Sequence, residues 1–208
     1  MKHIFLIFFA YLQFLSIGFS YSQNQKSQET LGNWKLVKNS NDIKIYSRTY
    51  LQTQFKEYQA VMVIKTTPTK LLALIRDDKI AKDWISRMKE LKTVKVISQH
   101  EWFTYAEISL PFPFQNRDLI SHNLVTVNEE IIKIDLLSVP NFLPKTTDRV
   151  RMQNSKGFWQ FKQLANDEVE VMYQFFAEPV VALPQWFVAP FIANGIHSTF
   201  ENMREKVQ

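Results

Sequence analysis

Residues 110–118, LPFPFQNRD, limit the fold of this chain more than any other segment. The stretches on either side, 102–108 and 119–125, alternate in the way that strands do. Proline cannot donate a hydrogen bond to a sheet, so Pro111 and Pro113 end the first strand and stiffen the connection. The sequence therefore predicts two strands joined by a stiff loop, with Phe112 and Phe114 in the loop and an Arg-Asp pair directly after it.

The first 22 residues have the pattern of an export signal. Lys2 gives a positive start, residues 4–19 are almost wholly apolar, and Ser20-Tyr21-Ser22 places small residues where a signal peptidase cuts. We expect cleavage after Ser22 and a periplasmic or extracellular protein that begins at Gln23. The alternative is an uncleaved anchor, although the apolar run is shorter than the roughly 20 residues of a spanning helix.

Composition narrows the class of protein. The chain has no cysteine, so its fold does not depend on disulfides, and its four glycines form no phosphate-binding loop. The formal net charge is +5, which favours anionic surfaces such as lipid head groups. Lys and Arg are too dispersed for nucleic-acid binding. We expect a flexible lead-in over residues 23–33, then one monomeric domain over residues 34–208.

Strands and helices are both expected, which gives an α+β fold. Thr67 and Pro68 are typical of the cap and first position of a helix. A long last helix starts at Pro184 and carries apolar residues at helical spacing. The expected strands cover residues 34–37, 43–47, 55–64, 94–98, 102–110, 119–127, 131–137, 156–161 and 169–176. This order favours a curved antiparallel sheet around the last helix.

The P-x-P-x-x-x-R-D pattern of residues 111–118 resembles the StAR-related lipid-transfer (START) family. Four further segments resemble family motifs in the same order: Trp34 with Ile45, Tyr46 and Arg48; Lys56 to Ala60; Leu74, Ile75 and Asp77 with Trp84; and Phe176 to Pro179 with Leu183 to Phe187. The resemblance implies the helix-grip fold with an internal hydrophobic tunnel, in a secreted, bacterial-type member. It also implies binding of one lipid or amphiphile for transfer, storage or sensing, without a cofactor and without catalysis.

Two positions depart from the family pattern. The usual Pro-Gly-Gly after the last strand is Pro179-Val180-Val181. Sterol-type members often place an arginine about six residues after the Arg-Asp pair, and here that position is Asn123. This replacement speaks against a sterol ligand.

Strand alternation supplies candidate ligand contacts. Trp159 and Phe161 share one face of their strand, as do Tyr173 and Phe175 on the next. Tunnel wall and core coincide in this fold, so both readings apply to these aromatic residues. Tyr173 is the better contact, because its hydroxyl needs a partner.

Glu107 lies on the same face of its strand as Phe103 and Tyr105. If that face looks inward, all three line the tunnel and Glu107 holds a polar group of the ligand. If the register is shifted, Glu107 faces solvent.

Arg117 and Asp118 have two interpretations. They can bind a lipid phosphate at the tunnel end, or form a structural pair that pins the loop to the sheet. Neighbouring strand residues point to opposite faces, so only one of the two can face the cavity.

Four aromatic residues, Phe112, Phe114, Trp186 and Phe187, are candidates for a gate that docks transiently on a membrane surface. Prolines lie next to both segments. The alternative is that Phe112 and Phe114 cap the core.

The sequence offers little for catalysis. The spacing of His100, His122 and His197 matches no metal site, and no G-x-S-x-G is present. We predict no catalytic residue, metal or cofactor. One alternative is a helix-grip enzyme of aromatase/cyclase type, against which the export signal speaks. Another is an assembly partner with a closed core.

Overall fold

The computed structural model describes residues 31–51, 53, 55–178 and 185–208. The predicted export signal and most of the lead-in lie outside these residues. The strands are β1 (Lys35–Ser40), β2 (Ile43–Thr49), β3 (Lys56–Lys65), β4 (Met88–Ser98), β5 (Glu101–Ile108), β6 (Arg117–Val127), β7 (Ile131–Ser138), β8 (Val150–Arg151), β9 (Ser155–Gln163) and β10 (Glu168–Ala177). The helices are α1 (Pro68–Arg76), α2 (Ala81–Trp84) and α3 (Gln185–Val207). None of the described helices has the length and apolar character needed to cross a bilayer.

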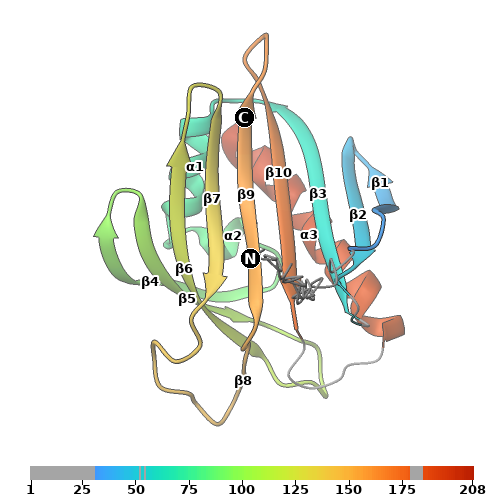
Figure 1. The fold of residues 1–208 in the computed structure, drawn as a ribbon, viewed down its shortest axis with the longest axis vertical. Helices are drawn as coiled ribbons and strands as arrows, with labels where there is room; N and C mark the ends of the chain where they lie inside the picture. Colours follow the sequence, from blue (N-terminus) through green and yellow to red (C-terminus); the bar gives the residue numbers. More distant parts are fainter. Residues whose placement is uncertain (1–30, 52, 54, 179–184) are drawn as a thin grey trace, which may run out of the picture.

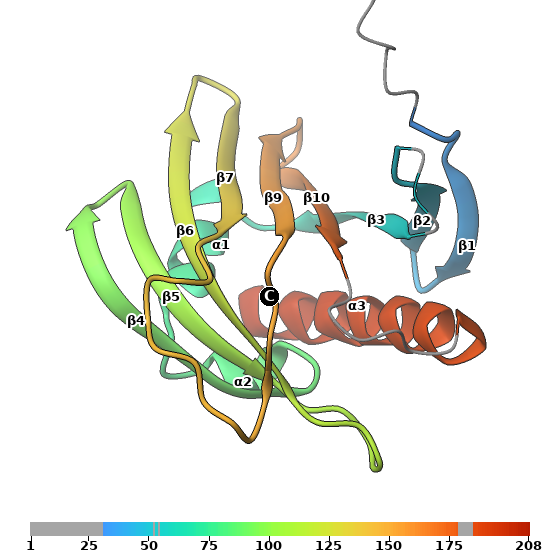
Figure 2. The same ribbon diagram turned by 60° about the horizontal axis from the view of Figure 1, so that its bottom comes forward.

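One curved sheet dominates the molecule. Its strand order is β1-β2-β3-β10-β9-β7-β6-β5-β4, antiparallel throughout, and the short β8 pairs in parallel with β6. All three helices lie on the same side of the sheet (Figure 1), and α3 runs beneath its concave face (Figure 2). The predicted α+β helix-grip architecture is confirmed.

The C-terminal half of α3 supplies the centre of the core. Phe200 and Met203 are fully buried, and the Phe200 ring lies 5.7 Å from that of Trp159. Trp84 of α2 packs edge-on against Trp159 at 6.3 Å, so α2, α3 and the sheet meet at this tryptophan.

A polar stripe on α3 holds the same half of the helix to the β1–β2 hairpin. Its members are spaced three or four residues apart, which places them on one helical face. The four contacts are Lys38 Nζ to Asn194 Oδ1 at 2.8 Å, His197 Nε2 to Ser40 O at 3.2 Å, Asn41 Nδ2 to Glu201 Oε1 at 2.6 Å, and Arg204 Nη2 to Asn41 O at 2.7 Å. We call these residues the α3 latch. They hold the helix in place from Asn194 onward. The first half of the helix lines a hollow described in the next section.

Candidate ligand-binding cavity

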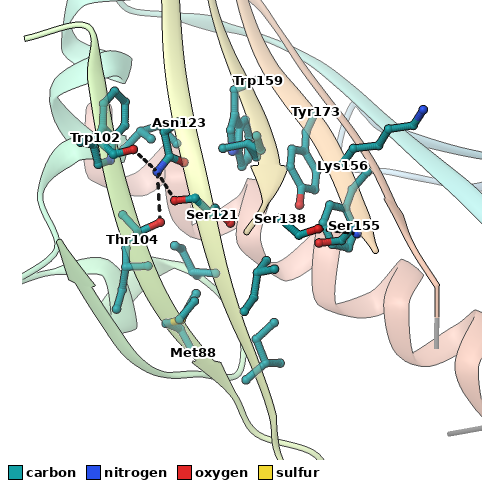
Figure 3. A pocket seen from close by; sticks show the side chains of 18 of the residues that line it. Met88, Trp102, Thr104, Ser121, Asn123, Ser138, Ser155, Lys156, Trp159 and Tyr173 are labelled. Atoms are coloured by element: carbon teal, nitrogen blue, oxygen red, sulfur yellow. Dashed lines mark hydrogen bonds between the residues drawn. The ribbon is translucent and has the colours of Figure 1, made fainter. Parts of the chain in front are cut away.

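A cavity of about 200 Å³ lies between the concave face of the sheet and the helices. Strands β5, β6, β7, β9 and β10 supply most of its wall, and Trp84 and Ile75 come from the helices. The cavity exists because several inward positions carry small side chains where a packed core would carry large ones. Figure 3 shows these side chains converging from neighbouring strands.

The polar groups that line this cavity are neutral. They belong to Ser86, Thr104, Ser121, Asn123, Ser138, Ser155 and Tyr173. Trp84 also lines the cavity, and its buried indole Nε1 has no hydrogen-bond partner among the described residues. Lys156 is the one charged residue among the described lining residues, and its side chain turns away (Figure 3), with Nζ 4.9 Å from the ring of Tyr50 on the outer face. The cavity therefore offers hydrogen bonds without a charge.

Asn123 is held in one orientation by its amide nitrogen. Nδ2 donates to the carbonyl oxygens of Trp102 at 3.1 Å and Ser121 at 3.2 Å, and lies 3.2 Å from Thr104 Oγ1 (Figure 3). Carbonyl oxygens only accept, so a flipped amide would set oxygen against oxygen. This fixes Oδ1 on the other side of the amide, where the described residues offer it no donor.

Tyr173 stands on β10 with its ring stacked on Trp159 at 4.3 Å. Its hydroxyl reaches no hydrogen-bond partner in the described part of the chain, although the residue lines the cavity. Burial raises the pKa of this hydroxyl well above its ordinary value of 10.0, so the phenol stays neutral.

A second hollow of about 190 Å³, which we call the outer chamber, adjoins the first, which we call the inner chamber. Ile108 and Phe175 line both, so they form the partition between them. The outer hollow is walled on one side by the first half of α3, through Phe187, Val188, Phe191 and Ile192. The hydrophobic interior predicted between sheet and helix is thus divided into two chambers.

Arg117 lines the outer chamber, whereas Asp118 points to the opposite face of β6. The only hydrogen bond of the Arg117 guanidinium within the described residues runs from Nη1 to the backbone oxygen of Gln115, at 3.0 Å. Burial lowers the pKa of Arg117 from 12.5. Glu178 lines the same chamber, but its carboxylate accepts a hydrogen bond from Asn154. Arg117 and Asp118 therefore do not form the structural pair considered above.

The expectation that Phe103, Tyr105 and Glu107 line the tunnel is corrected by the structure. Thr104 and Ala106 of β5 face the cavity, which sends the odd-numbered residues to the outer face. There the segment 139–149 crosses the sheet. Phe103 stacks on Phe142 at 4.5 Å, and the Tyr105 hydroxyl bonds Arg149.

Glu107 faces neither the tunnel nor solvent. Its carboxylate is 4% exposed and binds Arg149 at 2.7 Å, Lys89 at 3.0 Å and Asn116 Nδ2 at 2.7 Å. An apolar outer face covered by a loop looks like an inner face in the sequence, and this explains the wrong register.

The remaining predicted contacts fall into two groups. Asn123, Trp159, Tyr173 and Phe175 line the inner chamber. Phe161 is fully buried in the core beside it. The small hydroxyl residues Ser121, Ser138 and Ser155 were not predicted, although Ser121 and Asn123 share a face by simple alternation.

The predicted gate residues have different environments in the structure. The loop between β5 and β6 projects from the body of the protein (Figure 2), and Phe112 at its tip is 96% exposed. Phe114 packs instead against Phe187 of α3 at 5.0 Å, and Phe187 packs against Phe191 at 5.1 Å. Phe112 therefore does not cap the core, while Phe114 packs on the first half of α3. The side chain of Trp186 lies outside the described residues.

The model of the START domain family matches residues 20–208 of this sequence. The chain belongs to the START domain family. The resemblance found in the motifs is thereby confirmed over the whole described fold.

Three relatives place this START domain among known proteins. The uncharacterized protein PA1579 of Pseudomonas aeruginosa is 27% identical over 177 residues, which are 84% of this chain and 87% of that protein. The phosphatidylcholine transfer protein of Rattus norvegicus is 26% identical over 191 residues, 88% of each chain. The crystal structure of a STAR-related lipid transfer protein from Xanthomonas axonopodis superposes with a TM-score of 0.77 at 25% identity, covering 84% of this chain and 98% of that one.

Proposed function

We propose that this START domain binds a single lipid or other amphiphile in its two chambers and transfers it between membranes, without chemical change. The observation that carries the proposal is the apolar inner chamber, which lies between the sheet and the helices and is provided with neutral hydrogen-bonding groups. Such a site suits a ligand that is mostly apolar. The lipid-transfer names of two relatives support the same class of function.

The outer chamber and the adjacent loop between β5 and β6, which we together call the mouth, have features suited to a membrane surface. The exposed Phe112 ring can enter the interfacial region of a bilayer, where aromatic residues are stabilised. Arg117 in the outer chamber lacks a carboxylate partner among the described residues, so it can receive an anionic head group. Contact between Phe114 and Phe187 closes the mouth between visits.

Native mass spectrometry of the purified protein, followed by lipid extraction, tests the proposal. We expect a monomer that carries one amphiphile, and transfer of that amphiphile between donor and acceptor vesicles. Recovery of empty protein that takes up no lipid from a broad panel would refute it. Chemical conversion of the ligand during incubation would favour the enzyme alternative instead.

The export of the protein is a separate proposal, motivated by Lys2, the apolar run of residues 4–19 and Ser20-Tyr21-Ser22. Edman sequencing of native material should begin at Gln23. An intact Met1 in a soluble cytosolic fraction would contradict it.

A further inference from the structure

We infer that the inner chamber selects a ligand end that carries an uncharged hydroxyl group, and that Asn123 is the residue which reads that hydroxyl. This inference rests on the proposed function and names the chemistry of the buried end of the ligand. It follows from which hydrogen-bonding positions the protein has filled and which it has left open.

Asn123 presents an open acceptor. Both carbonyl oxygens near Nδ2 fix the amide, so Oδ1 cannot exchange places with the nitrogen. A neutral carbonyl oxygen in an apolar chamber gains from a partner that donates. The ligand atom that meets Asn123 should therefore carry a hydrogen.

Tyr173, on β10, presents a hydroxyl that has no hydrogen-bond partner among the described residues. It can donate as well as accept, so it does not by itself distinguish an alcohol from an ether or ester oxygen. Asn123 Oδ1, which only accepts, makes that distinction. Figure 3 shows Asn123 and Tyr173 on two sides of the chamber, with Ser121 and Ser138 between them.

Charge excludes anionic heads from this chamber. A phosphate or carboxylate group would need a counter-charge in an apolar site, because an unpaired anion is costly there. None of the described lining side chains provides one, since the Lys156 ammonium lies on the outer face. Arg117, which has no carboxylate partner among the described residues, lies beyond the partition formed by Ile108 and Phe175. An anionic head therefore stays in the outer chamber, and the inner chamber takes the hydroxyl.

The experiment compares 1-dodecanol with dodecyl methyl ether, which share a chain and differ in the donor hydrogen. Affinities are measured by displacement of a bound fluorescent fatty acid from the purified mature protein. We expect the alcohol to bind about fivefold more tightly, the value of roughly one net hydrogen bond. Three variants accompany the native protein: Asn123→Leu, Tyr173→Phe, and Thr126→Ala as a control on the exposed part of β6.

Each variant has a distinct expected result. Asn123→Leu should abolish the preference for the alcohol, and the ratio of the two affinities is independent of any general loss of stability. Tyr173→Phe should weaken both ligands by a similar factor while the fold is kept, because its hydroxyl bonds nothing in the described protein. Thr126→Ala should leave both affinities unchanged.

The failures are distinguishable. Equal binding of alcohol and ether overturns the inference and leaves the proposed function standing. A preference that survives Asn123→Leu overturns the role of Asn123. Binding of neither ligand, together with no response to a broad lipid panel, overturns both the inference and the proposed function.

Discussion

Arg151 donates from both Nε and Nη2 to a single carboxylate oxygen of Asp118, at 2.9 and 2.8 Å. The two side chains are 4% and 1% exposed. The same guanidinium also donates to the backbone oxygens of Pro140, Leu143 and Pro144. One buried arginine therefore ties the crossing segment 139–149 to β6, on the face opposite the cavity.

Replacing Arg151 should destabilise the protein strongly. Arg151→Met leaves the Asp118 carboxylate buried without a counter-charge, which typically costs about 3–5 kcal/mol in free energy of unfolding. Urea denaturation followed by circular dichroism measures the change. Asp148→Asn is the control, because Asp148 pairs with Arg149 at the surface and its loss should leave the transition unchanged. A similarly small effect for Arg151→Met would show that the segment is held by other contacts.

This pair marks a limit of prediction from sequence. Strand alternation correctly predicts that Arg117 and Asp118 point to opposite faces. In the structure Arg117 lines the outer chamber and Asp118 lies on the other face of the sheet. The partner of Asp118 lies 33 residues away on β8, a strand of two residues that pairs with β6 and is too short to be predicted from the sequence. Nothing local to residues 110–118 specifies that contact.

The orientation of β5 was predicted wrongly for a related reason. Alternating aromatic residues identify the strand, but they do not show which of its faces lines the cavity and which is covered by another segment. The outer face of β5 is covered by segment 139–149, so Phe103 and Tyr105 are shielded without lining the cavity. Helix α1, by contrast, was predicted with its cap, because Thr67 and Pro68 act locally: Thr67 Oγ1 accepts from Lys70 N at 3.2 Å.

The environment of Glu107 predicts a pH dependence of stability. Burial acts to raise its pKa, but hydrogen bonds from Asn116 and Lys89 and the charge of Arg149 outweigh this and hold it below 4.5. The folded state thus binds this proton less tightly than the unfolded state. The contribution of Glu107 to stability is present above the ordinary pKa and is lost as pH falls through the lowered one.

Glu107→Gln should therefore lower the melting temperature at neutral pH, and the gap to the native protein should narrow as the pH drops from about 7 to about 3. Thermal melts across this range check the expectation. Asp135→Asn removes a more exposed ion pair with Lys133 and should show a smaller gap at every pH. A gap that is constant with pH would place the effect of Glu107→Gln in packing rather than charge.

Phe112 and Phe114 should respond differently to the same substitution. Phe112→Ser removes an exposed ring, so the melting temperature should stay within error while binding to anionic vesicles and the transfer rate fall. Phe114→Ser removes the contact with Phe187 and should lower stability, by about 1–3 kcal/mol for a partly buried ring. Vesicle co-sedimentation and thermal melts of the two variants are compared. Unchanged vesicle binding by Phe112→Ser would exclude this ring as a docking group.

Gly195 lies in α3 between the mouth and most of the α3 latch. A Cβ added at this position would meet no atom within 4 Å, so packing does not require a glycine there. Glycine inside a helix is less favourable than alanine by about 0.5–1 kcal/mol, through backbone freedom. A helix held downstream by His197, Glu201 and Arg204 and lining the mouth upstream can bend at such a position.

Gly195→Ala should therefore stabilise the protein by up to about 1 kcal/mol and slow both uptake and release of ligand. The equilibrium affinity should stay nearly constant, because the substitution adds no contact to the chambers. Stopped-flow measurement of fluorescent fatty acid exchange gives the two rates. Ser198→Ala, within the latched half of α3, tests whether helix stabilisation alone slows exchange, and it should not. If Gly195→Ala stabilises the fold but exchange keeps its native rate, the mouth opens by movement of the Phe114 loop rather than by bending of α3.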